Sequence, residues 1–131
     1  MQIIQPPGWP RPKGYSNGIL AEGKTLFIGG QIGWNENEQF ESEDFVAQVR
    51  QTLLNTVAVL NAANAGPEHI ARMTWYITSR QDYLDNLKGI GEAYREIIGK
   101  NYPAMAMVEV SALMESQAKV EIETTAVIPN E

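Results

Sequence analysis

Hydrophobic and polar positions alternate most clearly in the stretch 104–128. Two apolar runs flank a short polar connection there, which is the pattern of a hairpin or of two neighbouring strands. In the second run Val120 and Ile122 point to one face and Glu121 and Glu123 to the other, because side chains alternate along a strand. Two carboxylates on one face of so apolar a strand indicate either that this face is wet or that it holds a polar site.

Apolar residues at three- and four-residue spacing predict two amphipathic helices. The first begins near Ser42, a plausible N-cap, and ends at Gly66. Its apolar stripe consists of Phe45, Val46, Val49, Leu53, Leu54, Val57 and Leu60. The second begins after Ser79, with Asp82 completing a near capping box, and ends at Gly99. Its stripe consists of Tyr83, Leu84, Leu87, Ile90, Tyr94, Ile97 and Ile98, and the interior Gly89 and Gly91 are assigned to close packing of this helix on a sheet.

The first quarter of the chain predicts an arm followed by a hairpin. Residues 1–18 are rich in proline and glycine, which excludes a central strand and favours an arm that lies over the surface. Short β-type runs follow at 18–22 and 25–28, and Gly23-Lys24 between them is a two-residue hairpin signal. Another strand is predicted at 70–78.

This order of elements predicts a single α+β domain over residues 1–131, with a mixed six-stranded sheet and two helices on one face. The opposite face would then be uncovered. It is expected to carry some of Met73, Trp75, Met105, Met107, Val120 and Ile122. A face this apolar predicts a symmetric oligomer that packs sheet against sheet.

Composition narrows the classes of function. The chain has no cysteine and one histidine, which excludes disulfides, thiolate nucleophiles and cysteine-based metal sites. Its 10 basic and 16 acidic residues give a net charge of −6, which opposes binding to nucleic acid. No run approaches the roughly 20 apolar residues that cross a bilayer, and the N-terminus lacks a signal-peptide pattern, so a cytoplasmic protein without membrane contact is expected.

Several short motifs together resemble one known family. They are Gly14-Tyr15-Ser16, Gly30-Gln31-Ile32, Tyr102-Pro103-Ala104, Val108-Glu109-Val110 and Val120-Glu121-Ile122-Glu123. Over nearly its whole length the chain resembles the Rid family, also called the YjgF or UK114 family and historically the L-PSP endoribonuclease family. The resemblance implies a chorismate-mutase-like fold and a homotrimer with a barrel-like core, in which clefts between subunits hold a small molecule.

The best-studied branch of that family hydrolyses reactive enamines and imines without a cofactor, and the resemblance implies the same class of reaction here. In that branch an arginine after Pro-Ala pairs with the substrate carboxylate, whereas this chain has Met105. Two further cleft positions of the branch, a polar residue and a serine, fall on Lys88 and Gly29. The positions that match are Tyr15, Gly30 and Glu121. The different residues at positions 29, 88 and 105 predict a substrate other than the general 2-imino acids.

The resemblance and the chemistry of the residues together give a candidate site without a metal or cofactor. Glu121 is the candidate proton shuttle, directly or through a bound water, and Tyr15 would hold the substrate or water. The candidate substrate-binding residues are Gly30, Gln31, Met105, Met107, Trp34 and Lys88. Lys88 ranks first as a replacement for the missing positive charge.

Structural alternatives stay open for these residues. Glu121 would instead bond across a subunit interface, the two methionines would be packing residues, and Lys88 would be a solvated helix residue. At the level of function, a non-catalytic trimer that senses or carries a metabolite is the alternative to a hydrolase. An endoribonuclease ranks last, because no basic cluster is visible in the sequence.

Overall fold

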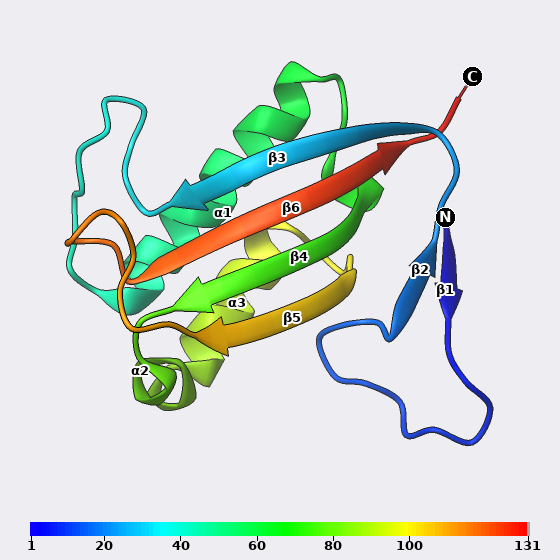
Figure 1. The fold of residues 1–131 in the computed structure, drawn as a ribbon, viewed down its shortest axis with the longest axis horizontal. Coiled ribbons are helices and arrows are strands. Elements are labelled where there is room, and N and C mark those ends of the chain that lie inside the picture. The colour runs from blue at the N-terminus through cyan, green and yellow to red at the C-terminus, as the bar shows by residue number, and fades with distance from the viewer. Residues whose placement is uncertain (131) are drawn as a thin grey trace.

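The computed structural model describes residues 1–130 and contains six strands, three α-helices and one short 3-10 helix in that range. In chain order they are β1 (Gln2–Ile4), β2 (Gly18–Leu20), β3 (Lys24–Ile32), α1 (Phe45–Ala62), the 3-10 helix Pro67–His69, β4 (Ile70–Ile77), α2 (Arg80–Asp85), α3 (Leu87–Ile97), β5 (Ala104–Glu109) and β6 (Val120–Ile128). Figure 1 shows the main sheet in front and the long helices behind it. The predicted α+β class, with helices on one face of a mixed sheet, is confirmed.

The sheet is divided differently from the six-stranded prediction. Four strands form the main sheet in the order β3-β6-β4-β5, and β1 and β2 form a separate two-stranded sheet. In the main sheet only β4 and β5 run parallel, and the other pairs are antiparallel. The sequence did not reveal β1, because the three residues lie in a stretch dominated by proline and glycine.

The predicted hairpin across Gly23-Lys24 is wrong. β2 pairs with β1, and β3 pairs with β6, with Lys24 opposite Ile128. Gly23 adopts a positive φ of 147°, and a Cβ on it would collide with the backbone carbonyl of Ile128. Glycine is therefore needed at a corner where the chain leaves one sheet and enters the other, and not in a tight two-residue turn.

The last two strands are not neighbours, so the prediction of a hairpin or of two neighbouring strands in the stretch 104–128 is wrong. β4 lies between β5 and β6, so the connection 110–119 passes over the end of β4 instead of forming a hairpin. Thr78 donates its backbone N–H to the Lys119 carbonyl at 3.2 Å and ties this connection to the sheet.

The helix signals were largely correct. Asp44, two residues after the predicted Ser42, caps α1 by accepting from the Ala47 N–H. Ser79 caps the next helix by accepting from the Asp82 N–H, as predicted. The second predicted helix is interrupted at Asn86 and so forms α2 and α3. Gly99 follows α3 with a φ of 78°, the left-handed conformation that ends helices.

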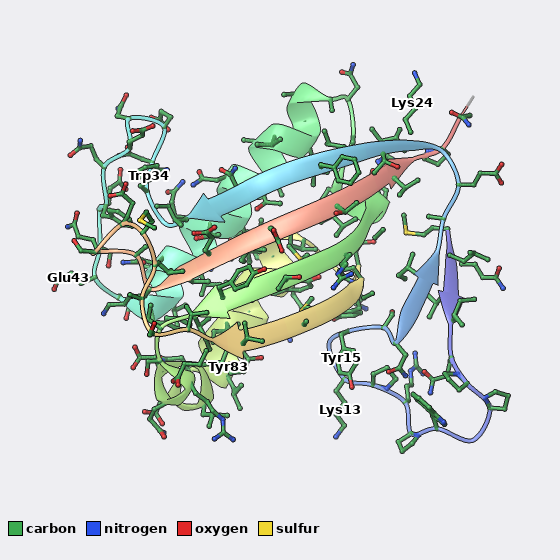
Figure 2. The ribbon with its side chains drawn as sticks, viewed as in Figure 1. Lys13, Tyr15, Lys24, Trp34, Glu43 and Tyr83 are labelled. Atoms are coloured by element: carbon green, nitrogen blue, oxygen red, sulfur yellow. The ribbon has the colours of Figure 1, made fainter. Side chains whose placement is uncertain are left out.

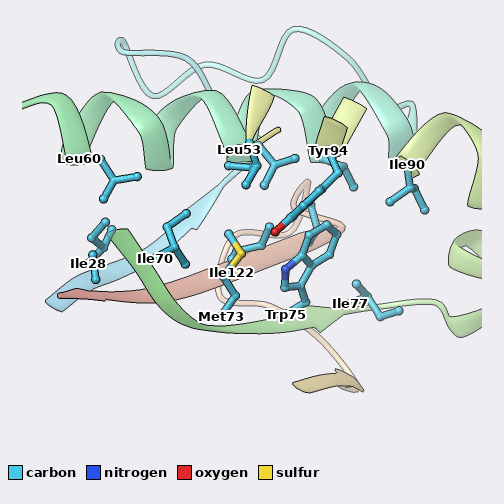
Figure 3. Packing of buried hydrophobic residues seen from close by; sticks show 14 of the residues in the cluster. Ile28, Leu53, Leu60, Ile70, Met73, Trp75, Ile77, Ile90, Tyr94 and Ile122 are labelled. Atoms are coloured by element: carbon cyan, nitrogen blue, oxygen red, sulfur yellow. The ribbon is translucent and has the colours of Figure 1, made fainter. Parts of the chain in front are cut away.

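The expectation of an apolar open face is wrong. Met73, Trp75, Val120 and Ile122 are all buried beneath the helices (Figure 3). The apolar stripe of the sheet and the apolar stripes of the helices bury each other, because this removes both from water within one chain. The open face carries the alternate residues, which are mainly polar.

Exposed apolar side chains nevertheless remain on the open face. Phe27 on β3 is 79% exposed and Val108 on β5 is 45% exposed. Phe27 lines a hollow of this face together with Arg72, Thr74 and Glu123, so the face is mixed in polarity. No helix of the part of the chain that the structure describes is long and apolar enough to span a membrane.

Two adjacent leucines of α1 test how the helix is oriented. Leu53 is fully buried in the core, whereas Leu54 is 47% exposed and does not widen the buried stripe as the sequence suggested. We predict that Leu53→Ala lowers the free energy of unfolding by about 2–5 kcal/mol through lost burial and a cavity. Leu54→Ala should change it by less than about 1 kcal/mol. Urea unfolding followed by circular dichroism measures both, and equal losses would contradict this orientation.

Candidate functional site

The candidate residues lie on opposite faces of the main sheet. In the register of β4 with its neighbours, Met73 is opposite Met105 and Trp75 is opposite Met107, so both methionines of β5 share the helix-covered face. Tyr76 is opposite Glu121 on one side and Val108 on the other, and these three share the open face. One copy of the chain therefore does not bring Glu121 and Met105 together.

On the open face, the Glu121 carboxylate lies directly over Gly30. A Cβ at position 30 would overlap Oε2 and crowd the rest of the carboxyl group. Glu121 is half-buried, and no hydrogen bond or ion pair joins its carboxylate to another side chain among residues 1–130. The structure therefore brings Gly30 and Glu121, two of the candidate residues, into contact.

Glu123, two residues further along β6, is held differently. Its Oε1 accepts from the Tyr76 hydroxyl at 2.7 Å. This hydrogen bond to a carboxylate raises the pKa of Tyr76, and the nearby charges of Glu123 and Glu121 act in the same direction. Glu123 is thus engaged within the chain, whereas the Glu121 carboxylate is available to a ligand or to another copy.

The other face holds a pocket of about 250 Å³ between α3 and β5. It is lined by Gly14, Trp75, Tyr83, Leu87, Ile90, Gly91, Tyr94, Arg95, Tyr102, Met105 and Met107. Tyr94 and Tyr102 stack with ring centroids 5.9 Å apart, and the Tyr94 hydroxyl donates to the Asn101 carbonyl. The wall is thus mostly aromatic and thioether surface, which suits a flat apolar molecule.

The N-terminal arm reaches the mouth of this pocket. Ser16 is buried, donates its backbone N–H to the Pro103 carbonyl at 2.9 Å and donates its hydroxyl to the Tyr102 carbonyl. These bonds fix the arm beside the start of β5 and place Gly14 in the pocket wall. Tyr15 between them is 42% exposed and lines a neighbouring groove with Tyr102.

Besides Glu121, Gly30 and Tyr15, three further sequence candidates lie outside the pocket wall. Trp34 packs on Phe40 with ring centroids 5.9 Å apart, and Figure 2 shows it at the opposite end of the molecule from Tyr15. Lys88 is exposed on α3 and is not in the pocket wall. Gln31 is half-buried, and its side-chain amide donates to the Gly29 carbonyl at 3.2 Å.

The sequence reasoning missed Arg95, the single charged residue in the wall of this pocket. The signal that was present is the spacing of Gly91 and Arg95, four residues apart and so on the same side of a helix. Assigning both glycines to packing concealed it. Gly89 does pack closely, since a Cβ there would lie 3.2 Å from Val46 of α1, but Gly91 faces the Arg95 guanidinium.

The described residues, 1–130, contain no group of three His, Cys, Asp or Glu side chains close enough together to hold a metal ion. The candidate residues provide the Glu121 carboxylate on the open face of the sheet and, on the other face, the aromatic pocket with Arg95 in its wall.

Comparison with known proteins places the chain among relatives of nearly the same length. A family model described as endoribonuclease L-PSP matches residues 10–128. A RutC family protein of Pyrococcus horikoshii is 34% identical over 127 residues, which are 95% of this chain and 96% of the relative. The human 2-iminobutanoate/2-iminopropanoate deaminase is 28% identical over 114 residues, which are 86% of this chain and 79% of the relative.

Solved structures show the same similarity. The Rid family protein YyfB of Yersinia pestis superimposes with a TM-score of 0.83 at 30% identity, covering 97% of this chain and 98% of that one. E. coli TdcF, solved with bound serine, superimposes with a TM-score of 0.68 at 29% identity, covering 98% and 99%. The fold assigned from the sequence is thus shared with proteins of this family.

The burial of Tyr94 in the pocket wall can be tested by measuring how the free energy of unfolding depends on pH. Burial raises the pKa of Tyr94 far above its usual value of 10.0. The unfolded chain therefore loses this proton first, so the stability from neutral Tyr94 is complete below about pH 10 and declines as the pH rises beyond it, by up to about 1.4 kcal/mol per pH unit.

We predict that the free energy of unfolding of Tyr94→Phe is lower at pH 8, because the bond to Asn101 is lost, but falls less steeply than that of the parent between pH 10 and 11. Urea titrations at several pH values measure both slopes. Parallel curves for parent and variant would contradict a buried, neutral Tyr94.

Proposed function

This chain belongs to the endoribonuclease L-PSP family, the family of the Rid proteins, and on this premise we propose that it is a cofactor-free hydrolase that releases ammonia from a small enamine or imine. The family includes proteins named 2-iminobutanoate/2-iminopropanoate deaminase. The observation that carries the proposal for this chain is the position of the Glu121 carboxylate. It lies over Gly30, and no other side chain among residues 1–130 forms a hydrogen bond with it.

The reaction requires only proton transfers and water. An enamine takes a proton on carbon and becomes an iminium ion, which is the protonated form of the imine. Water adds to the iminium carbon, and its proton passes through Glu121 to nitrogen. The C–N bond then breaks, ammonia leaves, and the hydroxyl proton of the adduct passes to the Glu121 carboxylate, so that a carbonyl product remains. The protonated Glu121 is then ready to give a proton to the carbon of the next enamine, and a single carboxyl group can perform these proton transfers in turn if the substrate lies beside it.

The complete site in this proposal lies between two copies of the chain. Glu121 of one copy would meet the pocket of Met105 and Met107 of the next, because one copy alone places them on opposite faces of its sheet. A homotrimer with three such clefts satisfies this requirement. Phe27 and Val108, exposed on the open face, would then be covered by contact between copies.

The pocket indicates a difference from small 2-imino acids. Met105 offers a soft apolar surface at the position where the deaminase branch carries arginine, and Met107 and Tyr102 extend that surface. We therefore expect a substrate with an aromatic or acyl body. Tyr15, at the mouth of the adjoining groove, would contact the part of the substrate that extends out of the pocket.

Ammonia release from imines generated in solution, and from conjugated enamines, tests the activity. We predict that Glu121→Gln lowers kcat/KM at least about a hundredfold, the range of a general acid–base group. Gly30→Ala should also lower it, because the new methyl group occupies the place of the carboxylate. Glu123→Gln is the matched control on the same strand and face, and it should stay within about threefold of the parent.

Mixing two inactive variants tests the shared site. Glu121→Gln lacks the carboxylate, and Gly91→Leu places a side chain in the pocket. Refolding them together at equal amounts should restore about a quarter of the parent activity, the fraction of clefts with both halves intact after random assembly. Failure to recover activity, or a monomer by light scattering, would contradict a site between copies.

A non-catalytic binding trimer is the second candidate, and the aromatic pocket of each copy favours it. That pocket is formed within one chain and needs no contribution from Glu121. Saturable thermal stabilisation by small molecules, together with no ammonia release from any imine or enamine, would support this function and exclude the first.

A further inference from the structure

The Arg95 side chain lies over the turn of α3 that contains Gly91, beside the pocket. A Cβ on Gly91 would lie 3.4 Å from Arg95 Nη1, and both residues line the pocket of Met105 and Met107. The guanidinium therefore lies against the backbone at position 91, and a side chain longer than that of alanine at this position would compete with it for space. The missing side chain at Gly91 and the long side chain at Arg95 together put a cation at the pocket wall.

The guanidinium has no acidic partner among residues 1–130. The ion pairs of that part of the chain join Arg50 to Glu96 at 2.8 Å and His69 to Glu68 at 3.5 Å. No aspartate or glutamate contributes to the pocket wall, so Arg95 alone sets the sign of its charge. Arg95 is exposed, and no ion pair within residues 1–130 engages its guanidinium, so the pocket presents an anion with an arginine that is free to pair with it.

The remaining residues of the pocket wall indicate which kind of molecule would carry the anionic group. Figure 3 shows Tyr94 extending from α3 toward Trp75 on the sheet, and both rings line the pocket. Trp75 is 2% exposed, so its ring is a buried part of the pocket wall. Aromatic rings and methionine side chains favour a flat apolar body.

We propose that this pocket binds small carboxylates with an aromatic or similarly flat apolar body, and that Arg95 is the residue that selects the carboxylate. The inference deepens the proposed function and rests on it for the identity of the site. Met105 on β5 carries no positive charge, and in this proposal Arg95 on α3 supplies that charge instead. Arg95 thus replaces Lys88, the sequence-based candidate, which lies outside the pocket wall.

Binding of three probes to the full chain tests the proposal by calorimetry. Phenylacetate carries the anion and the ring, phenylacetamide is its neutral counterpart, and acetate lacks the ring. We expect saturable binding of phenylacetate and much weaker binding of the other two. Arg95→Gln should weaken phenylacetate binding roughly 10- to 100-fold, the effect of losing a charged hydrogen-bonding partner, and leave phenylacetamide unchanged.

Three further variants complete the test. Arg95→Lys keeps the charge but loses the planar fork, so it should bind with intermediate affinity. Arg80→Gln is the matched control, because it removes one positive charge from exposed α2 outside the pocket wall and should leave binding unchanged. Lys88→Gln should also leave binding unchanged. Absence of phenylacetate binding by the parent, parent-like binding by Arg95→Gln, or a loss with Lys88→Gln instead would overturn the proposal.

The probes are not hydrolysed, so this result is separate from catalysis. Phenylacetate binding through Arg95 without ammonia release from any imine would refute the hydrolase and leave the anion pocket standing. Ammonia release with the same kcat/KM in Arg95→Gln as in the parent would refute the anion pocket and leave the hydrolase standing.

Discussion

The alternation of side chains along β6 is the constraint on which the rest of this structure depends. β6 lies inside the main sheet, with β3 on one side and β4 on the other. Val120, Ile122 and Ala126 are buried against the helices, and Glu121 and Glu123 between them face the open side. A slip of one residue would put carboxylates in the core and isoleucine in water, so the register is strongly specified. The same pairing that builds the core therefore also fixes the position of Glu121.

This constraint also separates the two halves of the candidate site. The β4–β5 register places Met105 and Met107 on the face that the helices cover, away from Glu121. The pocket below α3 is therefore complete within one chain, whereas the carboxylate over Gly30 lies on the other face of the sheet. In the function that we propose, contact between copies brings the two together.

Local signals in the sequence predicted the elements well, and spacing alone could not predict how they pair. The Ser79 cap, the stop at Gly99 and the alternation at Val120 and Glu121 depend on neighbouring residues, so they were readable. The strand order and the pairing of β1 with β2 depend on contacts between distant segments, so they were not. The assignment of the apolar sheet face failed for the same reason, and Arg95 was missed because its role depends on the space left by Gly91.

The single bridge between Ser16 and Ala104 has a consequence for solubility. β5 is an outer strand of the main sheet, and only its first residue is joined to the arm. Outer strands with free backbone groups are templates for pairing with strands of other molecules, which leads to aggregation. By occupying the start of β5, the arm shortens the row of backbone groups available for such pairing. A chain trimmed of its first 16 residues would lose this bridge and leave the whole edge of β5 open to such pairing.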